Sequence, residues 1–137
     1  MSEENKALVR KVYEIIAGGG FGRAEEIVNP AVADNECPLE RGRPKLIDTF
    51  ERFAAEVRTA FPDVRVTVED IIAEGDRVAA RVTMRGTHLG EFEGIAPTGK
   101  RVEVRAIDMY RITDGKIVEH WGHGDDPTDC LRMPERG

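Results

Sequence analysis

The sequence has few cysteines, no long apolar run and no surplus of basic residues. Its 137 residues include two cysteines, Cys37 and Cys130, and no apolar segment approaches the roughly 20 residues of a membrane-spanning helix. The polar, charged start from Met1 to Lys6 does not resemble the apolar centre of a signal peptide. We therefore expect a cytoplasmic protein with reduced thiols and no membrane partner.

The charge balance excludes one large class of partner. The formal net charge is -6, and lysines and arginines are scattered among glutamates and aspartates. Proteins that track phosphates need a concentrated basic surface to displace counterions. No nucleic-acid partner is therefore expected.

What the sequence does contain is typical of one globular domain. Hydrophobic residues make up 40% and charged residues 34% of the chain, with no internal repeat or break in composition. A chain of this length buries a continuous core without disulfides. We predict a single domain over residues 1–137, of which about 122–137 is a mobile, glycine-containing C-terminal tail.

The first half of the chain has a helical period. Ser2 and the two glutamates after it suit a helix start, and the following apolar residues share one face as far as Gly18. A shorter helix is predicted over 23–28. The longest predicted helix, from Pro44, has apolar residues at steps of three and four, namely Leu46, Phe50, Phe53, Val57 and Phe61. This stripe requires a partner surface.

From Val64 the period changes to two, which is typical of half-buried strands. Tight turns at 74–76 and 113–115 join strands as hairpins. The predicted strands begin at Val64 and then cover 77–87, 100–112 and 116 to about 121. Helices followed by antiparallel strands indicate an α+β domain with helices on one face of the sheet. Strand twist would curl that sheet and leave an apolar hollow suited to a small ligand.

Several segments match those of a known family in order and spacing. They are Gly86-Thr87-His88-Leu89-Gly90-Glu91-Phe92, Pro97-Thr98-Gly99-Lys100, Ile107-Asp108-Met109-Tyr110-Arg111 and Asp114-Gly115-Lys116-Ile117-Val118-Glu119-His120-Trp121. Over nearly its whole length the chain resembles the SnoaL-like polyketide cyclases of the nuclear transport factor 2-like superfamily. The resemblance implies a cone-shaped, cystatin-like fold, with N-terminal helices packed on a curved, mostly antiparallel sheet. It also implies no metal and no organic cofactor.

Asp108 is the strongest candidate for catalysis. On a strand it shares a face with Val104 and Ala106, so a hollow lined by these residues would hold its carboxylate in apolar surroundings. A carboxylate shielded from water accepts a proton more readily. In the cyclases that the chain resembles, an aspartate of the matching strand removes a proton α to a carbonyl before intramolecular aldol ring closure. The alternative is an ion pair with Arg105 or Arg81 that only holds strands together.

His88 is the second catalytic candidate, because a neutral imidazole at a strand end could donate a hydrogen bond to a developing enolate oxygen. The same imidazole suits bonding to local backbone. The residues expected to contact substrate are Tyr13, Asn35, Phe50, Phe53, Met84, Tyr110 and Trp121. Tyrosine and tryptophan offer an apolar body and one donor, and the resemblance implies a polar pocket residue near Asn35. Each of these residues also has a structural reading, in the core or in a turn.

One cluster near the C-terminus has the ligand types of zinc: His120, His123, Asp125 and Asp126. Strand alternation gives no assurance that the two imidazoles converge, and the resemblance implies no metal. We therefore predict no metal site, and a solvated strand end in its place.

Three functions remain open from the sequence. The first is an enzyme in which Asp108 transfers a proton on a carbonyl compound, with ring closure or a related isomerisation or dehydration. The second is an epoxide hydrolase using Asp108 and Arg105, although three residues of separation on a strand point these side chains to opposite faces. The third is a non-catalytic protein that binds a small molecule. The expected partners are a small hydrophobic or aromatic carbonyl ligand and a second copy in a homodimer.

Overall fold

The computed structural model describes residues 2–18, 23–36 and 42–132, so Cys37 and the last part of the predicted tail, 133–137, lie outside it. In chain order the described elements are α1 (Ser2–Gly18), α2 (Ala24–Ile27), α3 (Leu46–Ala60), β1 (Arg65–Glu74), β2 (Arg77–Thr87), β3 (Arg101–Thr113), β4 (Lys116–Gly124) and α4 (Pro127–Arg132). From α1 to β4 the order of helices and strands agrees with the sequence pattern. No helix in these described ranges is long and apolar enough to cross a bilayer.

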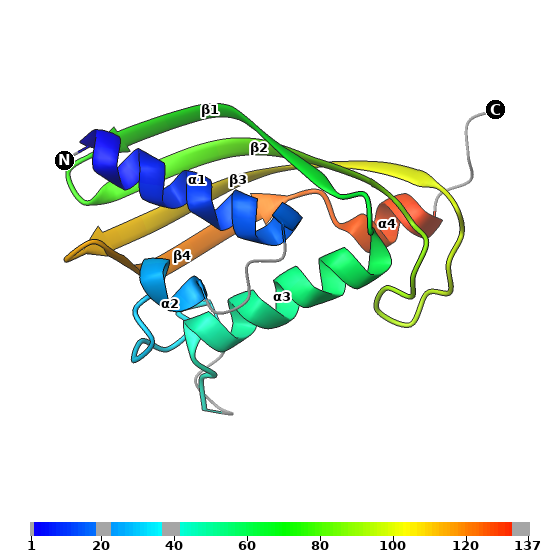
Figure 1. Ribbon diagram of the computed structural model, residues 1–137, viewed down its shortest axis with the longest axis horizontal. Coiled ribbons are helices and arrows are strands. Elements are labelled where there is room, and N and C mark those ends of the chain that lie inside the picture. Colours follow the sequence, from blue (N-terminus) through cyan, green and yellow to red (C-terminus); the bar gives the residue numbers. More distant parts are fainter. Residues whose placement is uncertain (1, 19–22, 37–41, 133–137) are drawn as a thin grey trace.

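The described strands form one antiparallel sheet in the order β1-β2-β3-β4, in which each strand pairs with the next along the chain. The β3–β4 turn consists of Asp114 and Gly115, both with positive φ (52° and 74°), as a tight two-residue hairpin requires. Figure 1 shows the sheet curving, with α1 and α3 on one of its faces. The α+β prediction, helices on one face of a curved antiparallel sheet, is confirmed.

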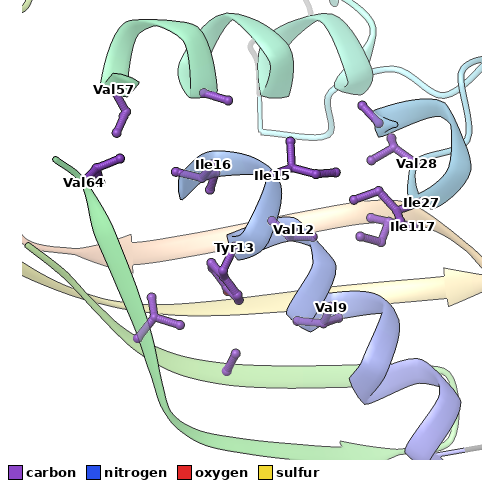
Figure 2. Close-up of a cluster of buried hydrophobic side chains, with 14 of the residues drawn as sticks. Val9, Val12, Tyr13, Ile15, Ile16, Ile27, Val28, Val57, Val64 and Ile117 are labelled. Carbon is purple, nitrogen blue, oxygen red and sulfur yellow. The ribbon is translucent and has the colours of Figure 1, made fainter. Parts of the chain in front are cut away.

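Helix α1 supplies the centre of the core because its apolar residues recur on one face. Figure 2 shows Ile15 and Ile16 of α1 between that helix and α3, while Ile27 and Val28 lie beside Ile117 of β4. All of these residues are buried. Of the predicted stripe, Leu46, Val57 and Phe61 are buried, whereas Phe53 is 41% exposed and Phe50 is half-buried. Phe50 and Phe53 border a cavity.

The predicted C-terminal tail is wrong for residues 122–132. Strand β4 continues to Gly124, and α4 packs on the end of β3 with Leu131 buried. The glycines taken as signs of mobility allow close approach of strands: a Cβ on Gly124 would lie 2.3 Å from the carbonyl oxygen of Arg105. Asp126 accepts hydrogen bonds from the backbone N–H and the hydroxyl of Thr128 and so orders the start of α4.

Candidate active site

A cavity of about 300 Å³ lies between α1, α3 and the concave face of the sheet. Its lining is mostly aliphatic and aromatic, from Val12, Ile16, Leu46, Phe50, Phe53, Val66, Val82, Met84, Val104 and Ala106. Among the described residues the polar side chains of the lining are Tyr13, Thr49, Asp108 and His120. An apolar hollow with a few convergent polar groups is the usual form of a small-molecule site.

The structure brings Asp108 to this cavity. Its side chain is 15% exposed, and Val104 and Ala106 of the same strand line the cavity beside it, as strand alternation predicted. Tyr13 donates a hydrogen bond from its hydroxyl to Oδ2 of Asp108 at 2.8 Å. Nε2 of His120 lies 3.1 Å from Oδ1. Each carboxylate oxygen therefore has a hydrogen-bonding partner.

The alternative reading of Asp108, an ion pair with Arg81 or Arg105, does not occur. Arg81 binds Asp70 through Nε and Nη2 at 2.8 and 2.6 Å. Arg105 lies near Glu103, with Nη2 3.5 Å from its carboxylate, on the outer face of the sheet. Asp108 thus lies on the cavity face of β3, and Arg105 lies on the outer face.

Behind the carboxylate, the hydroxyls of Tyr13 and Tyr110 lie 2.9 Å apart. Because the Tyr13 hydroxyl proton points to Asp108, Tyr110 donates to Tyr13 in turn. Burial, followed by the charge of Asp108, raises the pKa of both phenols above the usual 10.0, so both stay protonated and act as donors. Tyr110 was expected to contact substrate, but it lies in a second layer behind Tyr13 and is not part of the lining.

His120 could not be recognised from the sequence as a partner of Asp108, because its position depends on an irregularity in the β3–β4 hairpin. Near the turn, Ile112 lies opposite Ile117, but Arg111 lies opposite Glu119. Val118 is therefore an extra residue in β4, a β-bulge that shifts the register by one. A one-residue shift exchanges the two faces of every later residue in the strand.

The bulge explains why Trp121 does not reach the cavity. Without it, Trp121 would lie opposite Asp108 on the concave face; with it, Gly122 takes that place and His120 lies on the concave face opposite Tyr110. Trp121 is on the outer face, where the guanidinium of Arg77 lies 5.5 Å from its ring centroid. The prediction that Trp121 lines the hollow is corrected by this register.

Asn35 also differs from its predicted role in the pocket. Its side-chain amide pairs with the backbone of His120, accepting from the N–H at 2.9 Å and donating to the carbonyl at 2.8 Å. It is absent from the cavity lining. Asn35 therefore attaches the segment before α3 to the free edge of β4 and fixes the strand that carries His120.

His88 lies in the core away from the cavity. It is 0% exposed, its ring packs 5.6 Å from that of Phe61, and Nδ1 accepts the backbone N–H of Thr98 at 3.1 Å. With Nδ1 an acceptor, the neutral ring carries its proton on Nε2, and that nitrogen has no partner among the described residues. The structure does not bring His88 to Asp108, so the predicted catalytic role has no geometric support.

The residues of the zinc hypothesis do not converge. His120 is on the concave face, whereas His123 lies opposite Ile107 on the outer face. Asp125 accepts the backbone N–H of Arg105. Within the described ranges no group of three or more histidine, cysteine or acidic residues has the placement to hold a metal ion.

Comparison with known proteins places these features in a family. The sequence profile of the SnoaL-like polyketide cyclases matches residues 6–128. Aklanonic acid methyl ester cyclase AcmA of Streptomyces galilaeus is 30% identical over 118 residues, which cover 85% of this chain and 81% of the relative. Nogalonic acid methyl ester cyclase of Streptomyces nogalater is 30% identical over 97 residues, covering 70% and 72% of the two chains.

Solved structures agree with the sequence comparison. The crystal structure of AclR from Streptomyces galilaeus, described provisionally as a hydroxylase, matches with a TM-score of 0.79 and 30% identity, covering 98% of this chain and 89% of AclR. The likeness confirms the predicted nuclear transport factor 2-like fold. Because the family profile spans most of the chain, this protein belongs to the SnoaL-like polyketide cyclase family.

Proposed function

We propose that the protein is a cofactor-independent enzyme in which Asp108 removes a proton α to a carbonyl and promotes intramolecular aldol ring closure. The observation that carries the proposal is the carboxylate itself, 15% exposed at the polar end of an apolar cavity. A carboxylate in such a site exchanges its water shell for fixed donors and serves as a general base. Tyr13 and His120 are those donors.

In the proposed reaction Asp108 takes one proton from the substrate and returns it to the product. A C–H bond α to the carbonyl breaks, its proton goes to Asp108, and the electron pair forms an enolate. The enolate carbon then forms a C–C bond to a second carbonyl of the same molecule, whose oxygen becomes an alkoxide. Asp108 protonates that alkoxide and returns to its ionised state. No oxidant or other reactant is consumed.

The lining favours a neutral, largely apolar substrate. A cavity of about 300 Å³ is at the lower end of ligand pockets, and within the described residues its lining contains no lysine or arginine to pair with an anion. Phe50, Phe53 and Met84 offer apolar contacts to an aromatic ring system. The related cyclases AcmA and that of S. nogalater are named for methyl esters, so we propose an aromatic carbonyl compound whose acid groups are esterified.

An epoxide hydrolase is the less favoured candidate, because Arg105, its proposed arginine, is on the outer face. A non-catalytic binding protein would have the same cavity but would tolerate loss of the carboxylate. The substitution Asp108→Asn separates the two remaining readings.

The test measures turnover of aklanonic acid methyl ester by wild-type protein and Asp108→Asn. The variant keeps the shape of the side chain, so we expect kcat to fall by about 10³-fold, the middle of the range for a general base, with an unchanged melting temperature. Binding of prodan, a neutral fluorescent aryl ketone, serves as the control for the cavity. Turnover by the variant at the wild-type rate would exclude Asp108 as the base.

We also propose that the chain pairs with a second copy through the outer face of its sheet. Ile72, Ile107 and Met109 are 68%, 55% and 40% exposed on that face, and Trp121 lies opposite Met109. Exposed apolar side chains gathered on one sheet face are typical of a self-association surface.

A further inference from the structure

In the acid–base step described above His120 only donates to Asp108, although its ring also lines the cavity. Nε2 lies 3.1 Å from Oδ1 of Asp108, and Nδ1 lies 3.3 Å from Oε1 of Glu36. Because both ring nitrogens face carboxylate oxygens, each needs a proton to donate. Only the imidazolium carries both protons.

The charges around the ring favour the same form. Burial opposes a charge on His120, but the hydrogen bond and charge of Asp108, together with the charges of Glu36 and Asp34, outweigh it and raise the pKa above its ordinary value of 6.5. The remaining neighbour on β3 is the protonated phenol of Tyr110, with its ring centroid 5.0 Å away. The facing carboxylates therefore favour the charged form of the ring.

The backbone around His120 is held by the segment that carries Glu36. Asn35 bonds to both backbone groups of His120, and the N–H of Gly122 donates to Oε2 of Glu36 at 3.4 Å. Strand β4 is at the edge of the sheet, so the backbone groups of His120 and Gly122 can bond to Asn35 and Glu36. The ring is consequently oriented from both sides before any ligand binds, which is the preorganisation that stabilises developing charge.

We infer that His120 is a second catalytic residue, an imidazolium whose Nε2–H donates to the substrate carbonyl oxygen when Asp108 takes the α proton, and that Glu36 positions it. The inference rests on the function proposed above. Oδ1 of Asp108 would accept the α proton and Nε2 of His120 would donate to the carbonyl oxygen. These two protein atoms are neighbours, as are the two substrate groups. As the C–H bond breaks, the hydrogen bond donated by Nε2–H changes its acceptor from the Asp108 carboxylate to the enolate oxygen. After ring closure Nε2–H donates to Asp108 again, and the imidazolium keeps both protons throughout.

The first experiment needs no substrate. Chemical shifts of the histidine ring carbons, measured by NMR against pH, give the pKa of His120 in wild-type protein and in Glu36→Gln. We expect the wild-type value to lie above 6.5 and the variant value to be lower, because one of the two facing carboxylates has become neutral. An identical midpoint in both proteins would overturn the role assigned to Glu36.

The second experiment measures turnover of aklanonic acid methyl ester by His120→Leu. Loss of one donor to an oxyanion lowers kcat by about 10²-fold or more, and prodan binding should remain. His123→Leu is the matched control, since His123 is exposed on the opposite face of β4. For Glu36→Gln, the alkaline limb of the kcat profile should move to lower pH, whereas a purely structural role would lower only the melting temperature.

The outcomes separate this inference from the proposed function. Wild-type turnover by His120→Leu, with Asp108→Asn inactive, would refute the role of His120 and leave the base in place. Wild-type turnover by both variants would refute the function itself. If the wild-type protein does not cyclise the ester, the same variants are compared by a second assay. That assay measures the rate of deuterium exchange at the α carbon of bound prodan. Absence of catalysed exchange as well would refute both.

Discussion

The absence of a side chain at Gly122 leaves room for the carboxylate of Asp108. Replacing Gly122 with alanine tests whether catalysis depends on the exact position of that carboxylate. Gly122 lies opposite Asp108 in the β3–β4 pair. A Cβ at this position would lie 2.8 Å from Oδ1 of Asp108 and 3.2 Å from Cε1 of His120. The first distance is shorter than real Cβ contacts, so the carboxylate must move. The backbone need not move, because the clashing atom is at the end of a side chain.

The size of the effect follows from the contacts that the carboxylate must give up. A displacement that relieves the clash removes the hydrogen bond between Oδ1 and Nε2 of His120, now 3.1 Å long. One such bond between charged groups contributes about 2 kcal/mol to stability, whereas a misplacement of about 1 Å in a reacting group costs about 10²-fold in rate. We therefore expect Gly122→Ala to lower kcat by about 10²-fold and the stability by about 2 kcal/mol.

Turnover of aklanonic acid methyl ester and urea unfolding measure the two effects. Gly18→Ala is the matched control, since a Cβ there would meet nothing within 4 Å at the end of α1. In Gly122→Ala the NMR titration of His120 should also shift to lower pH, because the ring loses part of its contact with Asp108. Wild-type kcat together with an unchanged His120 titration would refute the view that Gly122 positions the carboxylate.

Two further predictions concern residues outside the cavity. His88→Ala should lower the free energy of unfolding by about 3 kcal/mol, as for other large buried side chains, without changing kcat; a fall in kcat at unchanged stability would restore a catalytic role for His88. Met109→Glu should convert a dimer into a monomer in sedimentation velocity, because a charged carboxylate would replace an apolar contact of the pairing surface. A monomeric wild-type protein would contradict the proposed pairing.

The parts of the site that the sequence predicted are those that depend on local period. Alternation along β3 predicted that Val104, Ala106 and Asp108 share a face, and the structure places all three at the cavity. The steps of three and four along α3 likewise predicted Phe50 and Phe53 toward a partner surface, and both line the cavity. Within one strand or helix, backbone geometry alone determines which residues share a face.

Contacts between elements could not be predicted in this way. The partnership of His120 with Asp108 and the outward position of Trp121 both depend on one extra residue in β4, and no local pattern marks where such a bulge falls. His88 was misjudged for a similar reason. A strand-end histidine suits a pocket or a core equally well, and the choice depends on Phe61 and Thr98, which come from other parts of the chain.

By itself the sequence determined the order of helices and strands from α1 to β4, the hairpin turns and the concave face of β3, because these follow from periodicity and turn chemistry over a few residues. The tertiary structure alone decided which groups meet at Asp108. That choice depends on strand register and on the close approach permitted by Gly122. Both depend on how two strands pair, and there a shift of one residue exchanges a histidine for a tryptophan.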